Sequence, residues 1–136
     1  MHWGGSHISR ATLQKAERLR GRRTFQLLRQ LGFTHQEGPL RVRALFFHVR
    51  VEPYPIRVAF SVARRAYRKA HDRNRLRRLL REAYRRQKNE FWAALPKGEL
   101  WLWWQGEASA TPPSLPRLQE LMKRLFWQVL HRCATF

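Results

Sequence analysis

The residues best placed to do chemistry lie in one strongly basic stretch, positions 64–88, where twelve of twenty-five residues are Arg or Lys. Only Asp72 and Glu82 oppose this charge. From about Asp72, apolar residues recur at helical spacing, which predicts an amphipathic helix running to about Ala94. Guanidinium groups in a row on a packed helix bind phosphates, so we expect this helix to grip a polyanion. At about 100° per residue, the basic arc collects Arg73, Arg77, Arg78, Arg81, Arg85 and Lys88, with Asn74 among them.

The composition narrows the class of partner. The chain has 136 residues, a net charge of +19 and a hydrophobic fraction of 43%, which favours one folded domain over disorder. Such a charge is self-repulsive unless a polyanion neutralises it, so nucleic acid is the leading partner class and an acidic membrane surface the second. No apolar stretch approaches the roughly 20 residues that span a bilayer, and the first residues lack the apolar region of a secretory signal. The single Cys133 favours a reducing, cytoplasmic compartment.

Other elements must position the basic helix. Thr24 is expected to cap a short helix at 25–31, which Gly32 would end in the left-handed conformation. Two strands are predicted, over about Arg41–Val51 and Ile56–Ala63. Alternation along the first strand divides its residues into two faces. Leu45, Phe47 and Val49 are expected in the core, and the opposite face, expected to be a functional surface, carries Ala44, Phe46, His48 and Arg50.

After the basic helix, residues 100–104 are apolar on both faces, which predicts a strand in the interior of the sheet. A last amphipathic helix is expected from about Leu115. The resulting order, α-β-β-α-β-α, is typical of a two-layer α/β domain. We expect a flexible basic arm at 1–15, a single domain at 16–133 and a tail at 134–136. The apolar stripes consist of Leu76, Leu79, Leu80, Ala83, Tyr84 and Phe91 on the basic helix, and Leu118, Leu121, Met122, Leu125 and Val129 on the last.

The basic stretch also resembles a known family pattern. The segments Val62-Ala-Arg-Arg65, Arg68-Lys-Ala-His-Asp-Arg-Asn-Arg75, Leu76-Arg-Arg78 and Arg81-Glu82 resemble the signature of the bacterial ribonuclease P protein subunit. Its core is Arg-Asn-Arg followed by a basic pair and Arg-Glu. The flanking elements agree with the family over about residues 17–131. The specificity comes from this placement, because Arg-Asn-Arg alone occurs in many basic helices.

The resemblance implies a fold and a function. The fold would be an α/β sandwich around a mixed sheet, with a left-handed βαβ crossover in place of the usual right-handed one. The protein would assist a catalytic RNA, the ribonuclease P RNA, in the endonucleolytic removal of the 5′ leader from precursor tRNA. Mg²⁺ would be bound chiefly by the RNA, which performs the hydrolysis. The implied complex is cytoplasmic, with one protein and one RNA, without a small-molecule cofactor or a membrane contact.

The resemblance also implies two binding surfaces. The leader would lie in a cleft between the first helix and the sheet, where aromatic rings stack on bases. Phe25 could equally be a core residue. Phe46 is better supported, because it shares a face with His48 and Arg50, with core burial as its alternative. Arg75 falls off the basic arc, so it could pack, pair with an acid or touch another RNA element. The expected leader-binding residues are Phe25, Arg29, Phe46, His48, Arg50 and Ser61. The expected RNA-subunit-binding residues are Arg64, Arg65, Arg68, Lys69, Arg73, Asn74, Arg75, Arg77, Arg78 and Arg81.

Some residues depart from the family pattern. Gln105 stands where the last strand commonly ends in a basic residue. Trp101, Trp103 and Trp104 replace small aliphatic residues, which favours a bulky core or apolar patch at these positions.

The nine acidic residues form no pair suited to two-metal hydrolysis, and the six His have no zinc-ligand spacing. Ser61 is not in a nucleophile elbow. A ribosomal-type or general RNA-chaperone protein remains the alternative, and a stand-alone nuclease is disfavoured.

Overall fold

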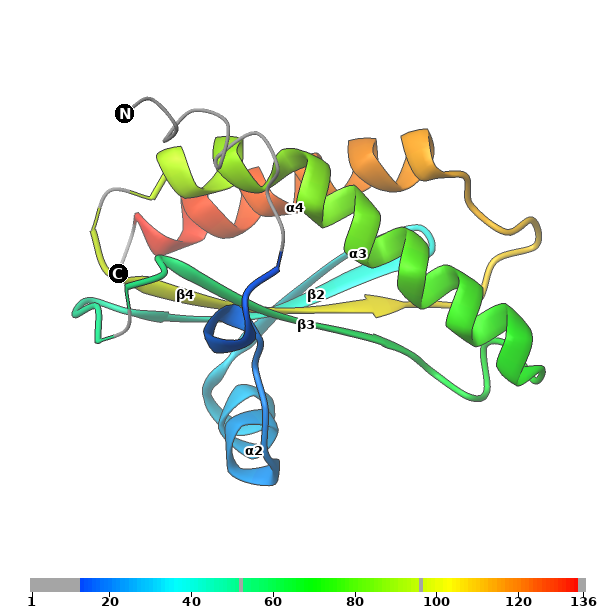
Figure 1. Cartoon of the computed structure of the whole chain (residues 1–136), viewed down its shortest axis with the longest axis horizontal. Helices are drawn as coiled ribbons and strands as arrows, with labels where there is room; N and C mark the ends of the chain where they lie inside the picture. The colour runs from blue at the N-terminus through cyan, green and yellow to red at the C-terminus, as the bar shows by residue number, and fades with distance from the viewer. Residues whose placement is uncertain (1–12, 52, 96, 135–136) are drawn as a thin grey trace.

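The computed structural model of the protein describes residues 13–51, 53–95 and 97–134. Figure 1 shows a sheet with two long helices on one face and a short helix projecting from the other. The elements follow the order η1 (Lys15–Glu17), α2 (Arg22–Leu31), β1 (Phe33–Glu37), β2 (Leu40–Phe47), β3 (Ile56–Val62), α3 (Ala70–Ala93), β4 (Glu99–Gly106) and α4 (Leu115–Cys133). The strands are arranged β1-β2-β4-β3, with β3 and β4 parallel and the other pairs antiparallel. The predicted α/β sandwich with a mixed sheet is confirmed.

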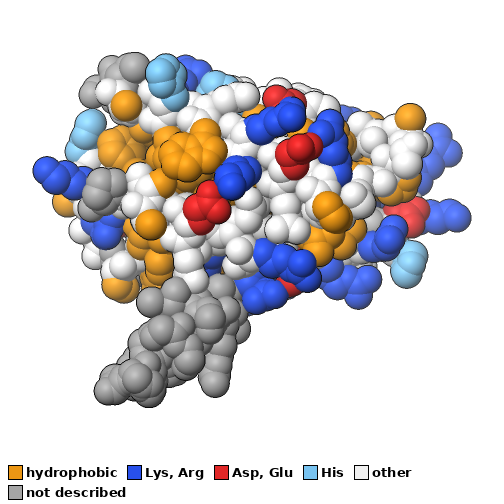
Figure 2. Space-filling view, turned by 90° about the horizontal axis from the view of Figure 1, so that it is seen from above, with side chains coloured by type: hydrophobic (Ala, Val, Ile, Leu, Met, Phe, Trp, Pro, Cys, Tyr) orange, Lys and Arg blue, Asp and Glu red, His pale blue; other side chains and the backbone are white. Residues whose placement is uncertain are grey.

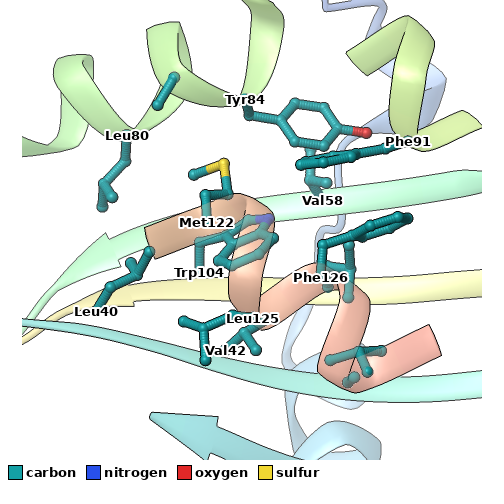
Figure 3. Close-up of a cluster of buried hydrophobic side chains, with 14 of the residues drawn as sticks. Leu40, Val42, Val58, Leu80, Tyr84, Phe91, Trp104, Met122, Leu125 and Phe126 are labelled. Carbon is teal, nitrogen blue, oxygen red and sulfur yellow. The ribbon is translucent and has the colours of Figure 1, made fainter. Parts of the chain in front are cut away.

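The main core lies between the sheet and the helices α3 and α4. Both predicted apolar stripes are buried there, with Leu79 only partly so, and β4 is an interior strand, as expected. Figure 3 shows Trp104 reaching from the sheet toward Met122 of α4. The rings of Phe91 and Phe126 stack with centroids 4.0 Å apart, which joins α3 to α4. Because the apolar stripe of α3 packs in this core, it determines which side of α3 is exposed to solvent.

The predicted assignment of the two faces of β2 is wrong. Leu40, Val42 and Ala44 are fully buried under the two long helices, and Phe46 packs on the same side. Leu45 lies on the opposite face, in a smaller cluster around Trp103, and Val49, beyond the end of the strand, is 71% exposed. Both faces of β2 carry apolar residues, so alternation separates two faces without deciding which one the helices cover.

Two local features also differ from expectation. The edge strand β1 is not predicted, because only Phe33 of its five residues is buried and the rest are polar or charged. Gly32 ends α2 with φ −77°, so it does not adopt the left-handed conformation. A Cβ on Gly32 would come within 2.4 Å of the Leu28 carbonyl oxygen and 2.8 Å of the Ala44 carbonyl oxygen. Glycine is therefore required there by close backbone packing between α2 and β2.

Part of the predicted arm lies outside the described residues, which begin at Leu13. Leu13 packs on the main core and Lys15 begins η1, so ordered packing starts before position 16. The division into arm, domain and tail stays a prediction, as does the handedness of the crossover from β3 through α3 to β4. Within the described ranges, no helix is both long and apolar enough to cross a membrane.

Candidate nucleic-acid interface

The start of α3 and the loop before it form one basic surface. Arg73 donates hydrogen bonds through Nη1 to the carbonyl oxygens of Tyr67, at 2.9 Å, and Arg68, at 2.7 Å. These bonds fasten the loop to the first turn of the helix. Arg77 donates to Asn74 Oδ1 at 2.9 Å, which orients its guanidinium along the helix. Figure 2 shows Lys and Arg side chains gathered at the right-hand end, where α3 begins.

The structure brings the residues expected to bind the RNA subunit to this end of α3, with Arg75 facing away from the others. Arg73 and Arg77 are half-buried, because each is held by a neighbour. The other eight are exposed, namely Arg64, Arg65, Arg68, Lys69, Asn74, Arg75, Arg78 and Arg81. Their roles in RNA binding stay predictions.

The predicted basic arc does not extend to the second half of α3. Lys88 is buried and paired with Glu17, which comes from η1, so it presents no charge to solvent. Glu82 accepts hydrogen bonds from Arg85, at 2.7 and 2.9 Å, and from Arg86, at 2.8 Å. These bonds lower the pKa of Glu82 to about 2, so Glu82 is a negatively charged carboxylate that offsets the positive charge of both arginines. The free basic surface therefore ends near Arg81.

Arg75 lies off the arc, as its helical position indicates. It lines a small cavity of about 90 Å³ with Asp72, Tyr67 and the prolines 112 and 113. The carboxylate of Asp72 and burial together raise the pKa of Tyr67, with burial the larger cause. Arg75 thus faces the loop between β4 and α4 and belongs to a different surface from Arg78 and Arg81.

The outer face of α4 carries compensated charge. Arg117 pairs with Glu120 at 2.7 Å, Lys123 with Glu90 at 3.2 Å, and Arg124 with Glu37 at 3.1 Å. In the described part of the chain, Arg78 and Arg81 form no such pair. Of these two helices, the start of α3 therefore presents most of the positive charge that has no acidic partner, and α4 contributes little of it.

On the opposite face of the sheet, three of the expected leader-binding residues meet around Trp103. Trp103 donates through Nε1 to Ser61 Oγ at 2.8 Å. The ring of Phe25 meets it edge-on, with centroids 4.7 Å apart, and the Arg29 guanidinium carbon lies 5.1 Å from its centroid. Trp103 is 9% exposed and packs with Leu19 and Leu28, which confirms the predicted bulky core or apolar patch at this position. Trp103 lies two residues from Trp101 and from Gln105 on β4, so all three are on one face.

Arginines from two elements converge on the same face. Burial lowers the pKa of Arg43, and the positive charges of Arg41 and Arg29 lower it further. Arg41 donates to Gln36 Oε1 at 3.1 and 3.3 Å and lies 3.7 Å from Glu107. Sequence reasoning missed Arg41 and Arg43 as site residues, because it assigned their face of β2 to the core. We call the set Arg29, Arg41, Arg43, Phe25, Ser61 and Trp103 the open face.

Phe46, His48 and Arg50 do not join this group, so the predicted grouping is wrong. Phe46 packs toward the helix-covered core, 5.0 Å between centroids from His48. Arg50 donates to the carbonyl oxygens of Gly98, at 2.8 Å, and Leu95, at 3.1 Å, which ties the segment after β2 to the loop before β4. The packing of β2 under α3 and α4 puts Phe46 on the side away from α2.

The described residues include no group of three or more His, Cys, Asp or Glu side chains that could hold a metal ion. Nothing in their arrangement therefore supplies a carboxylate cage for Mg²⁺, which prefers such oxygen ligands. The arrangement is suited to binding phosphates and bases.

Comparisons with known proteins show the family and the fold of this chain. The model of the Ribonuclease P family matches residues 13–129. The ribonuclease P protein component of Chlorobaculum tepidum is 51% identical over 41 residues, 30% of this chain and 27% of that protein, so this match spans about a quarter of the curated relative. The RNase P protein of Staphylococcus aureus superposes with a TM-score of 0.66 at 17% identity, over 85% of this chain and 96% of that one, which shows a shared fold.

The RNase P protein of Thermotoga maritima gives a TM-score of 0.52 at 28% identity, over 87% of this chain and 92% of that one. The family model spans the sheet, the basic loop, α3 and most of α4. The chain therefore belongs to the Ribonuclease P family.

Proposed function

We propose that this chain is the protein component of ribonuclease P, which binds the catalytic RNA and the 5′ leader of precursor tRNA and so assists removal of the leader. Family membership supports the general activity. The two separate basic surfaces, one on α3 and one on the sheet, support the presence of two RNA contacts.

The observation that carries the leader-binding role is the convergence of Arg29, Arg41 and Arg43 on the open face. Burial is the larger cause that lowers the pKa of Arg43, and the charges of Arg41 and Arg29 lower it further, so this guanidinium carries its charge at a cost in the free protein. A phosphate backbone would offset that cost, and the half-buried ring of Phe25, which packs edge-on against the buried Trp103, lies beside it for stacking. We therefore keep Phe25, Arg29 and Ser61 as leader-binding residues and add Arg41 and Arg43. Trp103 is buried and supports Phe25 and Ser61 from below.

The RNA-subunit surface is proposed at the start of α3. Arg78 and Arg81 are exposed there, and Arg77 is held in place by Asn74. Planar guanidinium groups suit two-point contacts with phosphate oxygens. A rigid row of them on a helix packed against the sheet would orient the RNA relative to the open face.

We assign Mg²⁺ to the RNA subunit, because the described side chains provide no carboxylate cluster for it. Bound there, the metal would supply an activated nucleophile for phosphodiester hydrolysis. The side chains of this protein bind and orient the two RNAs, in a complex that we place in the cytoplasm.

A reconstitution assay tests the proposal. The purified chain should cut no precursor tRNA by itself, and should accelerate cleavage by a bacterial ribonuclease P RNA at low Mg²⁺ concentration. It should also tighten binding of precursor tRNA more than binding of mature tRNA. Absence of stimulation, or equal effects on the two substrates, would indicate a general RNA-binding protein instead.

A further inference from the structure

The two proposed RNA-binding surfaces approach each other at one end of the sheet. The central strand β4 ends at Gly106, between the start of β2 and the end of β3. The start of β2 carries Arg41 of the open face, and the loop after β3 carries Arg65 of the RNA-subunit surface. Glu107 follows β4 directly, so it lies at the junction of the two surfaces.

The carboxylate of Glu107 contacts one arginine of each surface. Its Oε2 lies 3.7 Å from Arg41 Nε, and its Oε1 lies 3.9 Å from Arg65 Nη2. Among the described residues, no other acidic side chain forms an ion pair with an arginine of either surface. One negative charge therefore interrupts the basic side chains where the two surfaces meet.

The position of Glu107 is determined by the backbone around it. Its N–H donates to the Pro39 carbonyl oxygen at 2.8 Å. A Cβ on Gly106 would come within 2.7 Å of Leu76 Cδ2, so β4 ends in close contact with α3. The side chain of Glu107 is 14% exposed, whereas that of Arg65 is 77% exposed. The carboxylate is thus held in place beside a guanidinium group that a phosphate can reach.

This carboxylate has two opposite effects on RNA binding, since it holds the arginines and repels phosphates. Ion pairs at 3.7 and 3.9 Å with a largely exposed partner hold their side chains only weakly. A phosphate bound to either arginine would lie roughly 7 Å from the carboxylate, where repulsion between like charges weakens binding by roughly 3- to 10-fold at low salt. The repulsion of phosphate therefore outweighs the positioning of the arginines.

We propose that Glu107 is a specificity-determining residue, which disfavours phosphates at the junction and so prevents unrelated RNA from using the two surfaces as one continuous basic band. This inference rests on the proposed function, in which the RNA subunit and the leader each occupy one surface. An unrelated RNA is held by phosphate contacts alone and follows basic side chains wherever they continue. Glu107 therefore weakens the binding of unrelated RNA more than that of the cognate RNA, which is specificity through a repulsive element.

The test compares the affinity of the purified chain for a bacterial ribonuclease P RNA and for an unrelated RNA of similar length. Glu107→Gln keeps the shape of the side chain and removes its charge. It should tighten binding of the unrelated RNA by roughly 3- to 10-fold at low salt, and binding of the ribonuclease P RNA by a smaller factor. Unchanged or weaker binding of the unrelated RNA, or equal tightening of both RNAs, would overturn the proposal.

Glu120→Gln is the matched control. Glu120 is 54% exposed and pairs with Arg117 at 2.7 Å on α4, so its substitution changes the net charge equally but away from both surfaces. The control should leave the ratio of the two affinities as in the wild type. If it reproduces the effect of Glu107→Gln, net charge alone is responsible and the proposal is wrong.

A second background ties the effect to the junction. Arg65→Gln removes the phosphate contact beside Oε1 of Glu107, so adding Glu107→Gln should then tighten binding of the unrelated RNA by a smaller factor than it does in the wild type. Equal factors in both backgrounds would show that Glu107 does not act on phosphates at this junction. Thermal unfolding midpoints of these variants should match that of the wild type, because the two ion pairs are weak.

The two levels of inference fail differently. If the wild-type chain binds the ribonuclease P RNA no better than the unrelated RNA, the proposed function fails. If the wild type discriminates between them and Glu107→Gln leaves that discrimination unchanged, the proposed function stands and Glu107 is not a specificity-determining residue.

Discussion

The ammonium nitrogen of Lys88 lies 2.8 Å from Glu17 Oε2, and both side chains are almost fully withdrawn from water, at 6% and 0% exposure. Glu17 Oε2 also accepts a hydrogen bond from the Gln14 backbone N–H at 2.7 Å, and the Lys88 ammonium lies 4.6 Å from the centroid of Trp92. This pair anchors η1 to the second half of α3. Because η1 leads directly into α2, it helps to position the helix that carries Phe25 and Arg29.

Lys88→Met should destabilise the protein strongly, because Glu17 would be left as an unpaired buried charge. Loss of one partner of a buried pair costs about 3–5 kcal/mol. The double variant Glu17→Gln with Lys88→Met removes both charges and should recover much of that loss. Denaturant unfolding midpoints measure both. A single variant as stable as the wild type would show that the pair contributes nothing to anchoring η1.

Arg78→Ala with Arg81→Ala should weaken binding of the ribonuclease P RNA and reduce its salt dependence. Each lost phosphate contact lowers the slope of log K against log salt by about one unit or less. Binding titrations between low and moderate salt give this slope. The control is Arg124→Ala, since Arg124 already pairs with Glu37 on the α4 side. An unchanged slope in the double variant would remove Arg78 and Arg81 from the interface.

Gly32→Ala should both destabilise the fold and weaken leader binding. The added Cβ meets two backbone carbonyl oxygens that cannot rotate away, so α2 must shift relative to β2, at a cost of about 1–3 kcal/mol. Gly38→Ala is the control. Its Cβ would meet open space, and its φ of +57° adds only local strain of about 1–2 kcal/mol far from α2. Equal leader affinities for the two variants would contradict this role of Gly32.

Glu82→Gln should lower stability at neutral pH and have no effect in strong acid. The pKa of Glu82 is lowered from 4.5 to about 2 in the folded protein, mainly by hydrogen bonds from Arg85 and Arg86. A lowered folded pKa contributes stability above the unfolded pKa, and that contribution is lost as pH falls from about 4.5 to about 2. Because these groups are partly exposed, we expect only about 0.5–1 kcal/mol. Unfolding free energies of the two proteins should converge across this pH range.

Phe46→Ala should reduce stability and leave the discrimination between precursor and mature tRNA unchanged. Phe46 packs on the helix-covered side of the sheet, so truncation leaves a gap costing about 3 kcal/mol or less. Arg43→Ala should do the opposite, with a small change in stability and a selective loss of affinity for precursor. Parallel measurements of unfolding and of binding to both substrates separate the two. Selective loss of precursor binding by Phe46→Ala would return this residue to the leader site.

The sequence by itself determines the helical stripes of α3 and α4, the interior position of β4 and the basic surface at the start of α3. These features follow from local periodicity, since residues three and four apart share a helix face wherever the helix lies. The family pattern around Arg73, Asn74 and Arg75 is likewise contiguous in the chain.

Only the tertiary structure decides which face of each strand is covered and which charges are cancelled. The partner of Lys88 lies 71 residues away in sequence, so no helical wheel could remove Lys88 from the basic arc. Phe46 and Leu45 have similar hydrophobicity, and only the docking of α3 and α4 assigns them to opposite environments. The same docking leaves Trp103, Trp101 and Arg43 on the other side of the sheet. Alternation along a strand defines two faces, and long-range packing alone gives each face its neighbour.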